Sequence, residues 1–252
     1  MTESALKVLN VSKSFGGVRA VRDVSIDLTA GERISVIGTN GAGKSTLFNA
    51  IAGVFPVTSG CIEMYGEDVT KLSTAARAKR GLARTFQTSR LFEQLTAAEN
   101  VFIALGGNEF TGGLLRPVRR NPERWSRVGR LLDRVGLPGR GAQLVADLAH
   151  GEQRQLELAM ALALEPKLLM LDEPAAGFSP AERSHLITLL RELPQEITLL
   201  LIEHDMDIAL AVASRVIVMH DGEKILEGTP DEIRSSDRVR EIYLGGSIDH
   251  AA

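Results

Sequence analysis

The stretch GTNGAGKST, residues 38 to 46, combines three glycines with a lysine, a serine and two threonines. It follows the apolar run RISVI and precedes a pattern typical of a helix from about Ser45 to near Gly53. The spacing fits G-x-x-x-x-G-K-[ST], in which successive backbone N–H groups and a helix N-terminus bind a phosphate. Lys44 would add a charge at the β- and γ-phosphates, and the Ser45 hydroxyl can ligate Mg²⁺. The alternative, a glycine-rich turn with a chance lysine, leaves the order of strand, loop and helix unexplained.

A pair of carboxylates, Asp172 and Glu173, comes directly after the apolar run LLML. Ligands of α/β sheets bind at the carboxyl ends of the strands. There Asp172 would hold Mg²⁺ through water, and Glu173 would act as the general base that nucleotide hydrolysis needs. Taken alone, an acidic pair also fits a helix start or a solvated loop, and only the phosphate loop favours the chemical interpretation.

His204 follows the next apolar run, in the segment IEHDMD. The segment has no recognised metal-ligand spacing, and a single histidine at a strand end is more often structural than catalytic. Its place beyond the strand after LDEP brings it within reach of a γ-phosphate.

The composition is that of a globular protein, with 252 residues, 44% hydrophobic residues and a net charge of -3. This charge gives no overall attraction to nucleic acid or to an anionic membrane. The one cysteine, Cys61, excludes an internal disulfide framework and fits a reducing compartment. The N-terminal residues do not suggest a signal peptide, and no apolar run approaches the roughly 20 residues of a membrane helix.

Strand and helix patterns alternate at both ends of the chain around a block that is mainly helical, which predicts an α/β fold with a mostly parallel core. The first thirty residues indicate short strands with a turn in SFGGVRAV, and TLLLI is typical of a buried parallel strand. Capping boxes are expected at Thr96, Ser179 and Thr229, and a hairpin turn at Asp221-Gly222.

Together these residues resemble the ATP-binding subunits of ABC transporters, in the order and spacing of motifs over nearly the whole chain. The resemblance implies a single P-loop NTPase domain over residues 1–252, with an N-terminal antiparallel β part. A helical subdomain of about residues 91–164 is inserted in a RecA-like core, and about residues 217–252 form a C-terminal hairpin and helix.

The resemblance also implies roles for particular residues, with ATP and Mg²⁺ as cofactors. Phe15 would stack on adenine, although it could instead be a strand residue of the core. Gln87 in RTFQ would contact Mg²⁺ and sense the membrane partner, or be a polar loop residue. His204 would hold the γ-phosphate. Nucleotide binding is assigned to Gly38, Thr39, Asn40, Gly41, Ala42, Gly43, Lys44, Ser45 and Thr46, and, across a head-to-tail dimer, to Ala149, Gly151 and Glu152 of the signature loop.

Two positions depart from the family pattern. The signature L-S-G-G-Q is LAHGE here, residues 148 to 152, so a serine hydroxyl is absent at Ala149 and Glu152 brings a negative charge. The Gly151 N–H and the helix N-terminus still favour an anion, so we expect this loop to function. Ser179 replaces the aspartate of the loop after LDEP, and its expected role is that of a helix cap.

Within the family, RTFQTSRLFEQLTAAENV, EPAAGFSP and LIEHDMDIAL look most like subunits of branched-chain amino acid importers, and systems for urea, amides and small amino acids look similar. Such a subunit acts as a homodimer or with a paralogous ATPase, at the cytoplasmic side of the plasma membrane. It docks under two permease subunits, which a solute-binding protein supplies. Alternatives are an exporter of lipid or polysaccharide, or an ATPase acting on nucleic acid or ribosomes. The single phosphate loop and the absence of heptad runs and paired cysteines argue against the latter.

The arginine-rich stretch from Arg116 to Arg134 fits a solvated helical face better than a nucleic-acid patch, because only Trp125 interrupts it as an aromatic residue. Contact with anionic lipid headgroups is a third interpretation.

Overall fold

The computed structural model describes residues 3–85, 91–106 and 121–245. The chain divides into two compact units, each of which is described by itself. The first contains Met1–Leu82, Leu168–Glu173 and Pro194–Ala252, and the second Ala83–Lys167 and Pro174–Leu193. The second unit thus extends beyond the expected helical subdomain and includes helix α6 (Pro180–Arg191).

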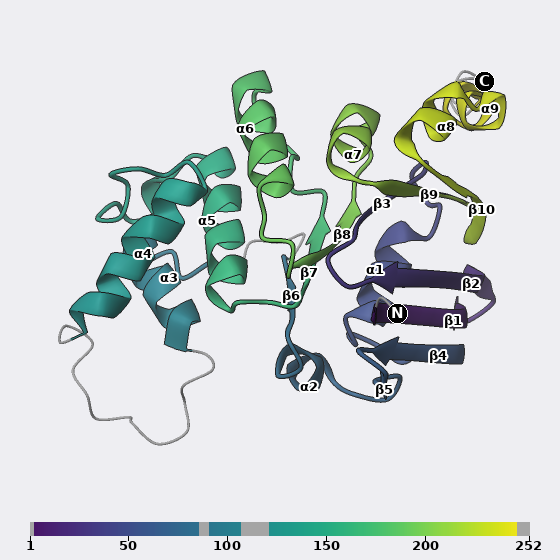
Figure 1. The fold of residues 1–252 in the computed structure, drawn as a ribbon, viewed down its shortest axis with the longest axis horizontal. Helices are drawn as coiled ribbons and strands as arrows, with labels where there is room; N and C mark the ends of the chain where they lie inside the picture. Colours follow the sequence, from purple (N-terminus) through teal and green to yellow (C-terminus); the bar gives the residue numbers. More distant parts are fainter. Residues whose placement is uncertain (1–2, 86–90, 107–120, 246–252) are drawn as a thin grey trace. The chain divides into compact units, whose positions relative to one another are not determined.

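An antiparallel sheet opens the first unit. Its strand order is β2 (Val18–Thr29), β1 (Ser4–Phe15), β4 (Ser59–Met64) and β5 (Glu67–Asp68), and the first three lie side by side in Figure 1. β1 and β2 turn at Gly16-Gly17, as expected, but each has 12 residues, so the expectation of short strands was wrong. Register shifts interrupt the pairing of β1 with both neighbours, which breaks the regular alternation that marks a long strand in a sequence.

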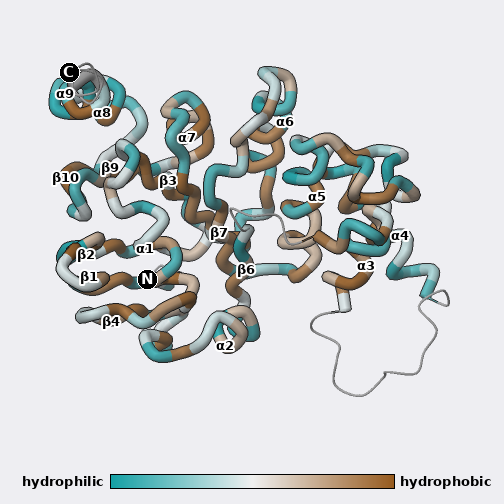
Figure 2. Tube along the Cα trace, turned by 180° about the vertical axis from the view of Figure 1, so that it is seen from behind, coloured by the Kyte–Doolittle hydropathy of each residue, from teal (hydrophilic) through white to brown (hydrophobic). Residues whose placement is uncertain are grey.

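The second sheet has the order β10 (Glu223–Gly228), β9 (Arg215–His220), β3 (Arg33–Ile37), β8 (Thr198–Ile202), β7 (Leu168–Asp172) and β6 (Leu82–Arg84). β3 pairs in parallel with β8 and β9, and β7 with β8, while β10 is antiparallel to β9. All residues of β7 and β8 are buried, and β3 and β7 are mostly hydrophobic in Figure 2. The mainly parallel α/β core is therefore confirmed.

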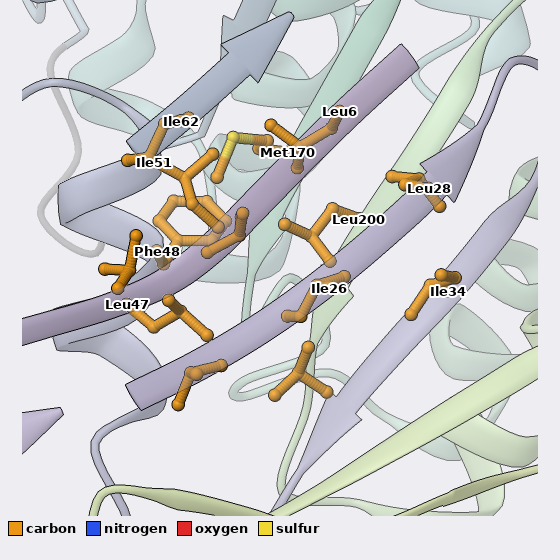
Figure 3. Packing of buried hydrophobic residues seen from close by; sticks show 14 of the residues in the cluster. Leu6, Ile26, Leu28, Ile34, Leu47, Phe48, Ile51, Ile62, Met170 and Leu200 are labelled. Atoms are coloured by element: carbon orange, nitrogen blue, oxygen red, sulfur yellow. The ribbon is translucent and has the colours of Figure 1, made fainter. Parts of the chain in front are cut away.

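Helix α1 (Lys44–Ile51) packs into the core between these strands. Figure 3 shows Phe48 and Ile51 of α1 beside Ile62 of β4 and Met170 of β7. This packing fixes the helix that follows the phosphate loop, because its apolar face is fully enclosed.

The C-terminal part of the first unit contains β9, β10 and three helices, α7 (Met206–Val212), α8 (Pro230–Ser235) and α9 (Asp237–Gly245). The expected hairpin turn is confirmed, because Asp221 and Gly222 both have positive φ, at 48° and 82°. Tyr243 of α9 packs on a buried cluster that includes Ile37, the residue before the phosphate loop. Burial raises the pKa of Tyr243.

The second unit is mainly helical in its described part, with α3 (Ala97–Gly106), α4 (Pro122–Arg134), the short 3₁₀ helix η2 (Val145–Asp147), α5 (His150–Ala163) and α6. The expected capping boxes at Thr96 and Ser179 are present here, and the one at Thr229 in the first unit. A short helix, α2 (Thr74–Ala78), lies in the first unit.

Helix α4 carries the arginine-rich stretch and is largely hydrophilic in Figure 2. Trp125 packs against Phe102 of α3 with ring centroids 4.5 Å apart, and the Arg124 guanidinium lies 4.2 Å from the centre of the Phe102 ring. The aromatic residue thus contributes to helix packing. Arg116 lies outside the described residues.

Among the residues that the structure describes, none of the helices is both long and apolar enough to cross a membrane.

Candidate active site

The phosphate loop connects β3 to α1 in the first unit. Gly38, Gly41 and Gly43 have φ values of 153°, 81° and 91°, which residues with a Cβ rarely adopt. The Lys44 side chain is buried, and its Nζ donates to the backbone carbonyls of Gly38 at 2.7 Å and Thr39 at 3.0 Å. The loop therefore encloses its own lysine, close to the N-terminus of α1.

Other parts of the first unit support this loop from behind. A Cβ atom at Gly43 would lie 2.3 Å from the backbone oxygen of Ala20 in β2 and 3.2 Å from the Cα atom of Gly222. The Gly222 N–H also donates to the Ala42 carbonyl at 3.1 Å. The turn between β9 and β10 thus fixes the phosphate loop, and the sequence predicts this turn but not its contact with the loop.

Two carboxylates follow β7 at the same sheet edge. Asp172 is the last residue of β7 and is buried, and its register partner is Ile202 at the end of β8. Burial lowers the pKa of Lys44, whereas the negative charges of Glu173 and Asp172 act in the opposite direction. The structure thus brings Lys44, Asp172 and Glu173 together, as the sequence predicted.

Glu173 has an unusual backbone for a residue with a side chain, with φ at 47°. Its N–H donates to the Ile202 carbonyl at 2.9 Å, which anchors the residue to the end of β8. Such conformations cost free energy and persist where surrounding contacts enforce them, often at functional sites.

His204 lies beside Glu173. Its Nδ1 is 3.5 Å from the nearer Glu173 carboxylate oxygen and 4.0 Å from that of Glu203. The histidine side chain is 56% exposed, whereas Glu203 is fully buried. A histidine oriented by a carboxylate and open to solvent on its other side can contact a bound phosphate. Over the described parts of the chain, no group of three His, Cys, Asp or Glu residues could hold a metal ion.

Phe15 ends β1 and is 47% exposed, so the alternative that it is a core residue is wrong. Its β2 partner is Val18, two residues before Ala20, which contacts the phosphate loop at Gly43. The ring stands 5.2 Å from that of Phe55, centroid to centroid, in an edge-to-face arrangement. An exposed aromatic ring beside a phosphate loop can stack on a base.

The signature loop begins α5 in the second unit, with Ala149 as the N-cap residue. The Ala149 N–H donates to one Glu152 carboxylate oxygen at 2.9 Å, and Arg140 Nε lies 3.0 Å from the other. The negative charge that Glu152 brings to this loop is therefore compensated. The carboxylate caps the helix and is paired with arginine.

Gly151 faces the start of α6 within the same unit. A Cβ atom here would lie 2.6 Å from Glu182 Oε1. The other Glu182 oxygen accepts hydrogen bonds from the N–H and the hydroxyl of Ser179, at 2.7 and 2.6 Å, and these bonds lower the pKa of Glu182. Ser179 is thus the helix cap that the sequence predicted, and its capping partner lies against the signature glycine.

Gln87 lies outside the described residues. Three residues contact the predicted site residues without being predicted themselves. They are Arg140 beside Glu152, Phe55 beside Phe15, and Gly222 behind the phosphate loop. Their only sequence signals are an arginine, an aromatic residue and a turn glycine, none of which indicates its neighbour.

The fold and this site define a P-loop ATPase, in which a strand–loop–helix unit lies beside carboxylates at the edge of a parallel sheet. The family described as "ABC transporter" matches residues 21–176, and the one described as "Branched-chain amino acid ATP-binding cassette transporter" matches residues 223–249. The chain belongs to the ABC transporter ATPases, as its motifs suggested.

Two relatives illustrate the likeness. The chain is 39% identical over 253 aligned residues to the high-affinity branched-chain amino acid transport ATP-binding protein LivG of Salmonella typhimurium, covering 97% of this chain and 99% of LivG. It is 37% identical to the corresponding BraF of Pseudomonas aeruginosa, with the same coverage.

Solved structures agree with this assignment. The ADP conformation of an ATP-binding cassette of an ABC transporter superimposes with a TM-score of 0.84 at 29% identity, covering 97% of this chain and all of that one. A dimeric post-hydrolysis cassette bound to ADP and Pi gives a TM-score of 0.79 at 26% identity, covering 89% of this chain and 98% of that one.

Proposed function

We propose that this protein hydrolyses ATP to energise a membrane importer of branched-chain or other small amino acids. The observation that carries the ATPase chemistry is the gathering of Lys44, Asp172, Glu173 and His204 around one sheet edge and its phosphate loop. The import of amino acids rests on the likeness to LivG and BraF over nearly the whole chain.

The phosphate loop, residues 38 to 46, binds the β- and γ-phosphates through its backbone N–H groups and the Lys44 ammonium. This ammonium donates to two carbonyls of the loop, so its protons point into the loop. Phe15 stacks on the adenine base at the edge of the same site.

Glu173 accepts a proton from the attacking water, and His204 donates a hydrogen bond to the γ-phosphate. His204 Nδ1 lies 3.5 Å from the Glu173 carboxylate, and a proton on the ring nitrogen that faces the γ-phosphate supplies the hydrogen bond to it. The two residues that receive the nucleophile and the γ-phosphate therefore orient each other.

Mg²⁺ fits the described donor set, because Ser45 and Asp172 carry the oxygen ligands that this ion prefers, and Asp172 is held buried at the end of β7. Gln87, which lies outside the described residues, is the third ligand that the motif order suggests. When bound, the ion neutralises charge on the phosphates.

Replacement of Lys44 by Ala is expected to weaken ATP binding by about 10- to 100-fold, because a charge-assisted hydrogen bond contributes about 1.5–3 kcal/mol. Titration of a fluorescent ATP analogue measures the change. Lys71→Ala, which alters an exposed lysine outside the loop, serves as the control. Unchanged affinity of the Lys44 variant would remove the phosphate-loop assignment.

The signature loop completes the site in trans in a head-to-tail dimer, where Ala149, Gly151 and the capped Glu152 approach the γ-phosphate bound by a second subunit. A solved cassette similar to this chain is dimeric. With Glu152 paired with Arg140, the N-terminus of α5 offers its backbone N–H groups to a phosphate, beside the Glu182 carboxylate that lies against Gly151.

Restoring the missing hydroxyl tests this arrangement. In a Glu173→Gln background, Ala149→Ser is expected to lower the ATP concentration for half-maximal dimerisation by about tenfold or more, since the hydroxyl adds a hydrogen bond to a charged group. Light scattering with and without ATP measures dimer formation. Ala146→Ser, at an exposed position of η2, is the matched control.

A serine at residue 149 would also cap α5, which predicts a higher Tm without ATP. The two effects can be measured separately. Capping of α5 changes the Tm without ATP, whereas the contact with phosphate changes only the ATP dependence of dimerisation. A raised Tm with an unchanged ATP dependence would show that this position does not contact phosphate.

The partners are a second ATPase chain, identical or paralogous, and two permease subunits that hold the protein at the cytoplasmic face of the plasma membrane, with a solute-binding protein acting on the other side. Purification from native membranes followed by reconstitution tests this assignment. Proteoliposomes containing ATP are expected to accumulate leucine, and the complex with Glu173→Gln should not. Extrusion of solute, or no transport of any small amino acid by an active ATPase complex, would overturn the importer assignment.

A further inference from the structure

Lys13 stands between two aromatic rings at the end of β1. Its Nζ lies 4.9 Å from the centre of the Phe15 ring and 4.8 Å from that of Phe55, and it donates to the Pro56 carbonyl at 2.7 Å. One ammonium group thus contacts the exposed ring of Phe15, the ring beside it and the backbone that carries that second ring.

Two hydrogen bonds join the same two segments. The Thr58 N–H donates to the Ser12 carbonyl at 2.8 Å, and the Ser14 N–H donates to the Thr58 hydroxyl at 3.0 Å. Hydrogen bonds, an aromatic pair and cation–π contacts therefore connect residues 55 to 58 to the last residues of β1. We call residues 55 to 58 the 55–58 segment.

The 55–58 segment directly continues α1, the helix of the phosphate loop. After α1 ends at Ile51, the Val54 N–H donates to the Asn49 carbonyl at 2.9 Å, which holds the chain against the helix. The helix whose first residues meet the phosphates is thus linked through three residues, 52 to 54, to the Phe55 ring beside Phe15.

From this we infer that Lys13 and Phe55 are positioning residues for the nucleotide base, which fix the Phe15 ring at a set place relative to the phosphate loop. The inference rests on the proposed function, in which Phe15 stacks on adenine. An exposed phenylalanine otherwise samples several rotamers, and a ring already held in one orientation loses less entropy when a base stacks on it. The Lys13 ammonium and the Phe55 ring restrain the orientation of the Phe15 ring without contacting the phosphates.

The test compares ATP with tripolyphosphate, which has the same phosphates and no base. Lys13→Met and Phe55→Leu are each expected to weaken ATP binding by about two- to fivefold, the range that a cation–π or an aromatic pair provides, with tripolyphosphate binding unchanged. Isothermal titration with each ligand gives both affinities. Lys13→Arg should restore ATP binding, because a guanidinium also stacks on rings. Lys7→Met, at a partly buried lysine earlier in β1, is the control.

The Phe15→Ala variant distinguishes the stacking of Phe15 on adenine from the positioning of its ring by Lys13 and Phe55. It is expected to weaken ATP binding by roughly 5- to 150-fold without affecting tripolyphosphate. In that background, Lys13→Met should add nothing further, because its effect acts through the ring. If Phe15→Ala is selective for ATP but Lys13→Met and Phe55→Leu are not, the positioning role is wrong and the stacking role stands. If Phe15→Ala changes neither affinity, the stacking role itself fails.

Discussion

The Glu173→Gln protein is expected to hydrolyse ATP at least about a hundredfold more slowly than the native protein, with ATP affinity changed less than about threefold. An amide cannot take a proton from the attacking water, and general-base catalysis contributes about 10²- to 10⁴-fold. Phosphate release under saturating ATP measures turnover, and equilibrium titration measures affinity. Retained steady-state hydrolysis would refute the role of Glu173 as base.

The structure explains why this variant should remain folded. The backbone of Glu173 is held by the hydrogen bond from its N–H to the Ile202 carbonyl, which the side chain does not make. Glutamine has the same shape and still accepts a hydrogen bond near His204. Glu165→Gln provides a matched control, because Glu165 also has a left-handed backbone, with φ at 49°, but belongs to the second unit and pairs with Arg127. Its turnover should equal that of the native protein.

The parts of the site that the sequence predicted are those set by local chemistry. The spacing of glycines around Lys44 requires a tight loop between a strand and a helix, and the structure has β3 and α1 there. Asp172 and His204 each follow a short apolar run. Because both runs are buried parallel strands next to each other, their ends had to meet at one edge of the sheet.

The parts that could not be predicted depend on contacts between segments distant in the chain. Nothing near Glu152 in the sequence indicates that Arg140 approaches it, so the compensation of this negative charge in the signature loop could not be predicted. Likewise, Gly222 supports the phosphate loop from about 180 residues away in sequence, through packing that follows only from the sheet order. The backbone irregularities of β1 and β2 are a third case, since register shifts remove the alternation by which a long strand is recognised.

Arg77→Met is expected to lower the free energy of unfolding by about 3–4 kcal/mol, because each buried carbonyl left without a donor costs about 1–3 kcal/mol. Arg77 is 1% exposed. Its guanidinium donates to the carbonyls of Ala50 and Ile51 in the last turn of α1, and to those of Leu72 at 3.1 Å and Thr70 at 3.1 Å. Burial lowers the pKa of Arg77, yet arginine stays charged at neutral pH, so a full positive charge caps the carboxyl end of the phosphate-loop helix.

Urea unfolding followed by circular dichroism measures this loss, with Arg80→Met as the control. Arg80 forms an exposed pair with Glu67, which is worth at most about 1 kcal/mol. Gly53→Ala should also destabilise the end of α1, through steric clash and backbone strain. Its Cβ would lie 2.8 Å from Arg77 Nε, and its φ is 75°. If the two arginine variants unfold at the same urea concentration, Arg77 does not hold α1. If only Arg77→Met and Gly53→Ala are destabilised, the end of α1 opposite the phosphate loop depends on one buried cation and on a glycine that leaves it room.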